Sequence, residues 1–197
     1  MHRVRDETEI YSNYLLSEFD ELNAMYKQYE GKNIDSGIVD EIIGYLIFMY
    51  FNGAQSVSLM IGESEFEEPD AITISSALYQ KTDGKDVIDR LEEYIGQPYG
   101  SSEKDIDAII RTEGHRLYVL GQMESARQIE EKGASLYKRW DTTLDGKERH
   151  THYLLNDTVK PIDEYFETIN GKTKAPGQFG IPEEDCNCRC ILRYERK

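Results

Sequence analysis

Apolar residues recur at steps of three and four along several stretches of the first 131 residues, which places them on one face of a helix. Gly31 and the turn-rich segment 96–100 interrupt this pattern. Asp35 or Ser36 is suited to begin a helix, and Gly133 is suited to end one. The spacing predicts helices at residues 9–30, from 35 or 36 to about 51 or beyond, 71–79, 85–95 and 101–132.

The pattern changes after Gly133, where turn residues and alternation replace the helical spacing. Leu136–Trp140 predicts a strand, and residues 188–194 predict a closing strand with Cys188 and Cys190 on the same face. Prolines and an Asp-Gly turn break up the sequence between them. The sequence therefore predicts an α+β fold, in which a mainly helical N-terminal region packs on a small C-terminal α+β tail of short strands and loops.

The charge is distributed unevenly along the chain, whose net charge is -15. Residues 1–131 hold 27 Asp/Glu against 11 Lys/Arg, whereas residues 132–197 hold 11 against 12. With the break at 96–100, this predicts an acidic helical region at 1–100 and a separate domain at 101–197. An acidic surface repels phosphate backbones and anionic lipids, so proteins are the expected partners and direct nucleic-acid or membrane binding is disfavoured.

The N-terminus and the cysteines bear on where the protein is made. The first residues lack the apolar stretch of a signal peptide, and the densest apolar run, Tyr45–Phe51, is much shorter than the roughly 20 residues that span a bilayer. Cys186, Cys188 and Cys190 lie too close together to tie distant elements by disulfides. We expect a cytoplasmic protein whose cysteines are reduced thiols or metal ligands.

Four blocks of the second half stand in a characteristic order. They are Arg111-Thr112-Glu113 in the last predicted helix, then Trp140 with Asp145, Arg149 and His152, then Leu155–Val159 with Phe166, and finally Asn187-Cys188-Arg189-Cys190 after a Pro- and Gly-bearing loop. In this order and spacing they resemble the head-morphogenesis family typified by phage Mu protein F.

The resemblance implies a minor head (minor capsid) protein of a phage or prophage. Such a protein would act in capsid assembly through protein–protein contacts with portal, scaffold or capsid proteins. It would occupy the host bacterial cytoplasm during assembly and the virion interior afterwards.

A metal site is one interpretation of the histidine and cysteines near the end of the chain. Thiolate and imidazole are ligands that zinc prefers, and a turn plus a strand could bring His152, Cys188 and Cys190 around one ion. The alternative is structural. Asp145 would then cap its turn, Arg149 would pair with Asp145 or Glu113, and His152 would bond to a buried carbonyl. Glu113 could also pair with Arg116 three residues on.

Catalysis is a further alternative, because His150 or His152 with Arg149, Lys147 and Asp145 supplies the groups of a nuclease. The acidic bulk of the chain works against a nucleic-acid substrate, so the sequence favours a protein that is not an enzyme, and no residue is expected to be catalytic. Two other functions stay open. One is a phage-encoded effector or nuclease-like domain that uses His150, His152, Cys188 and Cys190, and the other is a zinc-stabilised interaction module.

Overall fold

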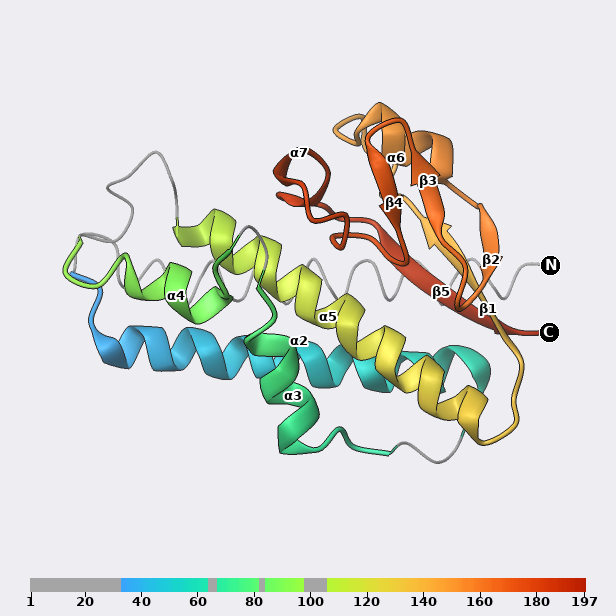
Figure 1. Ribbon diagram of the computed structural model, residues 1–197, viewed down its shortest axis with the longest axis horizontal. Helices are drawn as coiled ribbons and strands as arrows, with labels where there is room; N and C mark the ends of the chain where they lie inside the picture. The colour runs from blue at the N-terminus through green and yellow to red at the C-terminus, as the bar shows by residue number, and fades with distance from the viewer. Residues whose placement is uncertain (1–32, 64–66, 82–83, 98–105) are drawn as a thin grey trace.

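The computed structural model describes residues 33–63, 67–81, 84–97 and 106–197 (Figure 1). The helix predicted at 9–30 lies outside these residues. The remaining predicted helices are present within them, and the C-terminal region consists of short elements. The predicted α+β class is confirmed.

Two long helices, α2 (Ser36–Ile61) and α5 (Ile106–Glu131), lie side by side and run in the same direction (Figure 1). The Asp35 side chain caps α2 by accepting a hydrogen bond from the Ile38 amide, as expected. Helix α2 continues ten residues beyond Phe51 and ends at Gly62, whose left-handed backbone suits glycine. It lies at the centre of the core, where Ile42 and Leu46 are fully buried.

Glycines allow the two helices to touch backbone to backbone. A Cβ atom on Gly53 would lie 1.9 Å from the Tyr118 carbonyl oxygen, and one on Gly121 would lie 2.1 Å from the Tyr50 carbonyl oxygen. No other residue fits at either position without moving a helix. The crossing point is therefore fixed by these two residues.

Two short helices, α3 (Ala71–Leu78) and α4 (Val87–Glu92), pack beside this pair, close to the predicted positions. Asp70 caps α3, and Asp86 with Asp89 forms a reciprocal capping box on α4. Ile74, Leu78, Val87 and Leu91 belong to the same buried cluster as residues of the two long helices and complete the apolar core of this layer.

The C-terminal region, residues 136–196, forms a small unit of two antiparallel sheets, seen in orange and red (Figure 1). Its central strand β1 pairs on both sides in the order β2-β1-β5, and Trp140 lies opposite Leu192. Strands β3 and β4 form a separate hairpin, and β5 packs against α2 and α5. The elements are β1 (Leu136–Asp141), α6 (His150–Leu155), β2 (Val159–Pro161), β3 (Phe166–Thr168), β4 (Gly171–Thr173), α7 (Pro182–Asp185) and β5 (Ile191–Arg196).

The structure corrects the sequence prediction in two places. Residues 150–155 and 182–185 form short helices where strands and loops were expected. The closing strand begins at Ile191, so Cys188 and Cys190 lie in the preceding loop. Ile191 pairs with Asp141, the last residue of β1, so residues 188–190 have no partner residue in that strand.

Helix α2 is, among the described residues, the one helix long and apolar enough to cross a membrane by length and composition. The apolar run is thus longer than the sequence analysis recognised. Half of the residues in its most apolar window are buried inside the protein, against α5 and the short helices. The structure accordingly explains the composition of α2 as that of a core helix.

Candidate metal centre

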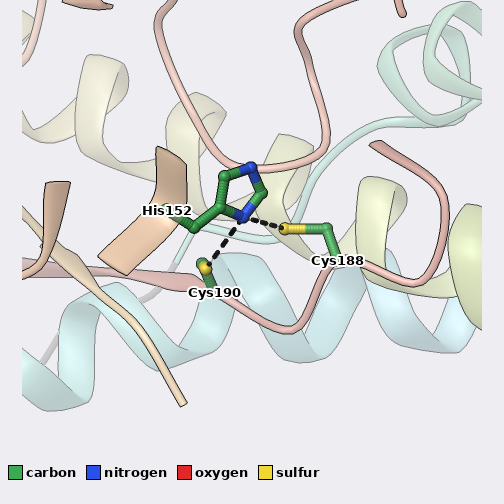
Figure 2. A group of neighbouring side chains, drawn as sticks. All are labelled: His152, Cys188 and Cys190. Carbon is green, nitrogen blue, oxygen red and sulfur yellow. Dashed lines mark hydrogen bonds between the residues drawn. The ribbon is translucent and has the colours of Figure 1, made fainter. Parts of the chain in front are cut away.

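His152, Cys188 and Cys190 come together in the interior of the C-terminal unit (Figure 2). The Nδ1 atom of His152 lies 3.3 Å from Sγ of Cys190 and 3.7 Å from Sγ of Cys188. The three side chains are almost completely buried, and all three donor atoms lie within 4.8 Å of one another. Both thiols therefore face the same ring nitrogen.

Residues from the start of α5 hold the cysteine loop in place. The Asn187 amide donates to Thr112 Oγ1 at 3.1 Å, and Arg111 Nε donates to Asn187 Oδ1 at 3.3 Å. Arg149 donates to the carbonyl of Cys186 from the other side. Arg111, Thr112, Arg149 and Asn187 thus have a common structural task, which is to set the turn that carries the cysteines.

His152 is the third residue of α6, and its orientation is fixed by an acidic side chain on α7. Nε2 of His152 lies 2.8 Å from Oε2 of Glu184, which is fully buried. Glu184 also accepts hydrogen bonds from Thr151 Oγ1 at 2.9 Å and Asn170 Nδ2 at 2.7 Å. Burial raises the pKa of Glu184, but the bonds from Asn170 and Thr151, together with His152, hold that pKa below its ordinary value.

An ionised Glu184 favours a proton on Nε2 of His152, which leaves the Nδ1 lone pair directed at the two sulfur atoms. Sequence analysis missed Glu184. Glu183, Glu184 and Asp185 look alike in the sequence as acids in the first turn of a helix, and the buried position of Glu184 depends on how α7 packs.

Aromatic rings enclose the cluster. The ring of Trp140 meets that of His152 edge to face, with centroids 5.4 Å apart, and Phe179 stacks on His152 at 5.9 Å and lies 6.2 Å from Trp140. Thr142 Oγ1 donates to the carbonyl of His152 at 2.9 Å. The imidazole is therefore held rigidly by packing as well as by Glu184.

The two thiols share their protons unequally. A hydrogen bond from Cys188, together with the nearby His152, holds the pKa of Cys190 below its ordinary value although burial opposes this. The same hydrogen bond and burial raise the pKa of Cys188. The site thus favours at least one thiolate, the form in which cysteine binds metals.

His115 supports the loop from α5. Its Nε2 donates to the Cys190 carbonyl oxygen at 2.6 Å, and burial lowers the pKa of His115, so the ring is neutral. A Cβ atom on Gly177 would lie 3.0 Å from Nδ1 of His115, so a side chain at residue 177 would press on this ring.

The other residues singled out from the sequence lie apart from the cluster. Asp145 accepts from the Lys147 amide, as expected of a turn, but its ion-pair partner is Arg189 and not Arg149. The predicted pairing of Arg149 is wrong, because its guanidinium reaches the Cys186 carbonyl. The ring of His152 contacts sulfur atoms and Glu184 where a backbone carbonyl was expected.

The structure also tests the predictions for His150 and Glu113. His150 is exposed at the start of α6, so it does not join His152 and the cysteines. Glu113 pairs with Arg116 at 2.6 Å, as expected, and also with Arg90 at 2.6 Å. The arrangement as a whole suits the binding of a small ion, because the donor atoms are directed inward and are covered by aromatic rings.

Comparison with known proteins adds relatives for most of this region. A family model described as "Phage Mu protein F like protein" matches residues 73–193. Minor head protein GP7 of Bacillus phage SPP1 is 44% identical over 85 residues, which cover 43% of this chain and 27% of that protein. An NAD(+)–arginine ADP-ribosyltransferase, EFV, of Enterococcus faecalis is 32% identical over 97 residues, which cover 49% of this chain and 20% of the enzyme.

The aligned segments thus span about a quarter of the first relative and a fifth of the second. No solved structure matches the chain.

Proposed function

Since this chain belongs to the phage Mu protein F-like family of minor head proteins, we propose that it acts in the assembly of a phage head by contacting portal, scaffold or capsid proteins. The single observation that carries this proposal is the 44% identity to a minor head protein over 85 residues. The protein would be made in the host cytoplasm and retained in the virion.

The arrangement of the motif residues supports a binding role. Arg111, Thr112, Arg149 and Asn187 bond to one another or to backbone within the fold, and the histidine–cysteine cluster is buried. Their contacts therefore stabilise the fold, and partner proteins would bind to its outer surface.

The surface of α3 is the part of the helical layer best suited to a protein contact. Ile72 on α3 and Tyr79, which directly follows this helix, are 77% and 59% exposed, and both belong to the acidic part of the chain. Exposed large apolar side chains within a charged surface are typical of contact sites between proteins. We infer that this face touches a basic or apolar surface of a head protein.

A test is to co-express the chain with the portal, scaffold and capsid proteins of its own phage and to analyse assembled heads by sedimentation and mass spectrometry. We expect the chain to sediment with heads or with the portal. Ile72→Asp should weaken this association, whereas Ile169→Asp, at a 93% exposed residue in the β3–β4 turn, should not. Absence of the parent chain from heads, portals and scaffolds alike would contradict the proposal.

The similarity to an ADP-ribosyltransferase favours a second, narrower candidate, an effector function. The aligned segment is a fifth of that enzyme, so it supports a shared module more than a shared activity. Incubation of the chain with labelled NAD and arginine-containing protein would test it directly. Transfer of label would favour the effector, and unlabelled protein would leave head assembly as the function to pursue.

A further inference from the structure

We propose that His152, Cys188 and Cys190 bind a zinc ion that fastens the cysteine loop to helix α6. The inference rests on side-chain geometry in this chain and is independent of the head-assembly role. It would make the ion a structural part of the C-terminal unit.

The spacing of the donor atoms fits zinc coordination. Zinc–sulfur bonds of about 2.3 Å and zinc–nitrogen bonds of about 2.0 Å in a tetrahedron place nitrogen and sulfur roughly 3.5 Å apart. Nδ1 of His152 lies 3.3 Å and 3.7 Å from the two sulfur atoms, on either side of that value (Figure 2). An ion can therefore sit between the three atoms after only small side-chain movements.

A hydrogen-bond chain, in which Cys188 donates to Cys190 and Nδ1 of His152 accepts one proton, accounts for only one of the two sulfur–nitrogen contacts. A neutral imidazole with its proton on Nε2 has one lone pair, on Nδ1, and this lone pair can accept one proton at a time. Both Cys188 and Cys190 nevertheless face Nδ1, and both thiols are buried. A metal ion satisfies all three donors at once, because each contributes its own electron pair.

Glu184 supplies the outer contact that metal-bound histidines commonly have. Histidine ligands usually donate their second ring N–H to a carboxylate or carbonyl group, which fixes the tautomer and the ring orientation. Glu184 Oε2 lies 2.8 Å from Nε2 of His152, on the side of the ring away from the sulfur atoms. This carboxylate is itself held by Thr151 and Asn170.

The charges also favour a divalent, thiophilic ion. The two negative charges of two thiolates offset the two positive charges of Zn²⁺ and the imidazole is neutral, so the filled site adds no net charge to the buried interior. In the described part of the chain three side chains offer ligands. A solvent molecule is therefore the expected fourth ligand.

The direct test is metal content and cobalt spectroscopy on the full chain, purified under reducing conditions. We expect about one zinc ion per chain, and, after replacement by Co²⁺, the thiolate-to-cobalt charge-transfer and ligand-field bands of a four-coordinate site. The double variant Cys188→Ser/Cys190→Ser should lose both. Cys186→Ser is the matched control, because this third cysteine is exposed and outside the cluster, and it should keep both.

Glu184→Gln separates a metal site from a merely structural cluster. It should bind cobalt roughly 10- to 100-fold more weakly while keeping the same absorption bands, since the ligands are unchanged. Should the double variant fail to fold, titration of metal-free parent protein with Co²⁺ still decides the question. Parent protein that takes up no zinc and gives no thiolate–cobalt band, or equal loss in Cys186→Ser and in the double variant, would overturn the proposal.

Discussion

The helical layer and the C-terminal unit are stabilised in different ways. Helices α2 and α5 bury long apolar faces and approach each other closely at Gly53 and Gly121. The C-terminal unit has strands of three to six residues, and its interior includes the buried polar side chains of Lys138, His152 and Glu184. A unit with such short strands has little apolar area to bury, so directional contacts determine its shape.

The two regions share a buried apolar cluster, in which Val57 and Val119 of the long helices join Trp140 and Leu192. Directional contacts cross the same boundary. Gln122 of α5 donates to the Leu192 carbonyl of β5 at 3.0 Å and to Ser56 Oγ of α2 at 3.2 Å. His115 donates to the Cys190 carbonyl. The same helix that forms the apolar layer therefore also holds the cysteine loop in register. The proposed boundary near residue 100 remains a prediction.

The largest effect is expected at a polar site in the otherwise apolar helical layer. Glu113 is buried between Arg90 and Arg116, and Arg116 also donates to the Ala77 carbonyl of α3. Glu113→Gln leaves the buried guanidinium of Arg116 without its counter-charge, which should lower the free energy of unfolding by about 3–5 kcal/mol. Denaturant unfolding measures this.

Glu131→Gln is the control, because its pair with Arg127 is exposed. The control should cost less than about 1 kcal/mol. Similar losses of unfolding free energy in the two variants would show that the helical layer does not depend on this buried ion pair. The contrast between an apolar helical layer and a C-terminal unit shaped by directional contacts would then become sharper.

A smaller loss is expected from the helix crossing. Gly121→Ala places a methyl group against the Tyr50 carbonyl and must separate the helices, which should cost about 1–3 kcal/mol. Gly44→Ala in α2 meets no atom within 4 Å and should stabilise the protein by up to about 1 kcal/mol. Thermal or denaturant unfolding of the pair compares them directly, and opposite signs are the result that supports close packing.

Lys138 allows a pH test of the polar interior of the C-terminal unit. Burial lowers its pKa from 10.5 to about 8, while its ammonium group donates to the carbonyls of Ile162 and Lys174. Between these pH values the unfolded chain binds more protons than the folded chain, so this residue makes stability rise with pH.

The free energy of unfolding of the parent should therefore gain about 1–3 kcal/mol between pH 8 and 10.5, relative to Lys138→Met. Denaturant unfolding at a series of pH values, with both proteins in the same buffers, measures the difference. Parallel profiles for the two proteins would mean that Lys138 is hydrated in the folded state.

The sequence predicted the long helices of the fold. Helices α2 and α5 each contain 26 residues, enough to establish a helical spacing, and Asp35 marks the start of α2 correctly. Helices α6 and α7 contain six and four residues, fewer than two turns, so no spacing could reveal them. The late start of the closing strand depends on its pairing with β1, which ends at Asp141 opposite Ile191, and local sequence does not dictate that register.

The sequence predicted which residues could bind a metal at the candidate site, but not how the surrounding residues are arranged. The chemistry of thiols and imidazole was sufficient to select His152, Cys188 and Cys190, which the structure brings together. Glu184 reaches His152 only because α7 packs against α6. Arg149 supports the cysteine loop instead of pairing with an acid. Side-chain contacts that depend on tertiary packing cannot be predicted from the spacing of residues along the sequence.

The smallest effect is expected at the surface of the C-terminal unit, where Asp145 pairs with Arg189. Hydrogen bonds from Arg189 hold the pKa of Asp145 well below its usual range, so its contribution to stability is present above the ordinary aspartate value of about 4 and is lost as the pH falls through the lower folded value. Asp145→Asn should therefore melt slightly below the parent near neutral pH, and the gap should close in acid. Added salt should also narrow the gap, because the pair is exposed to solvent. A difference in melting temperature that persists in both acid and high salt would show that the turn formed by Asp145, and not its charge, stabilises this part of the surface. Directional contacts would then be important at the surface of the C-terminal unit as well as in its interior.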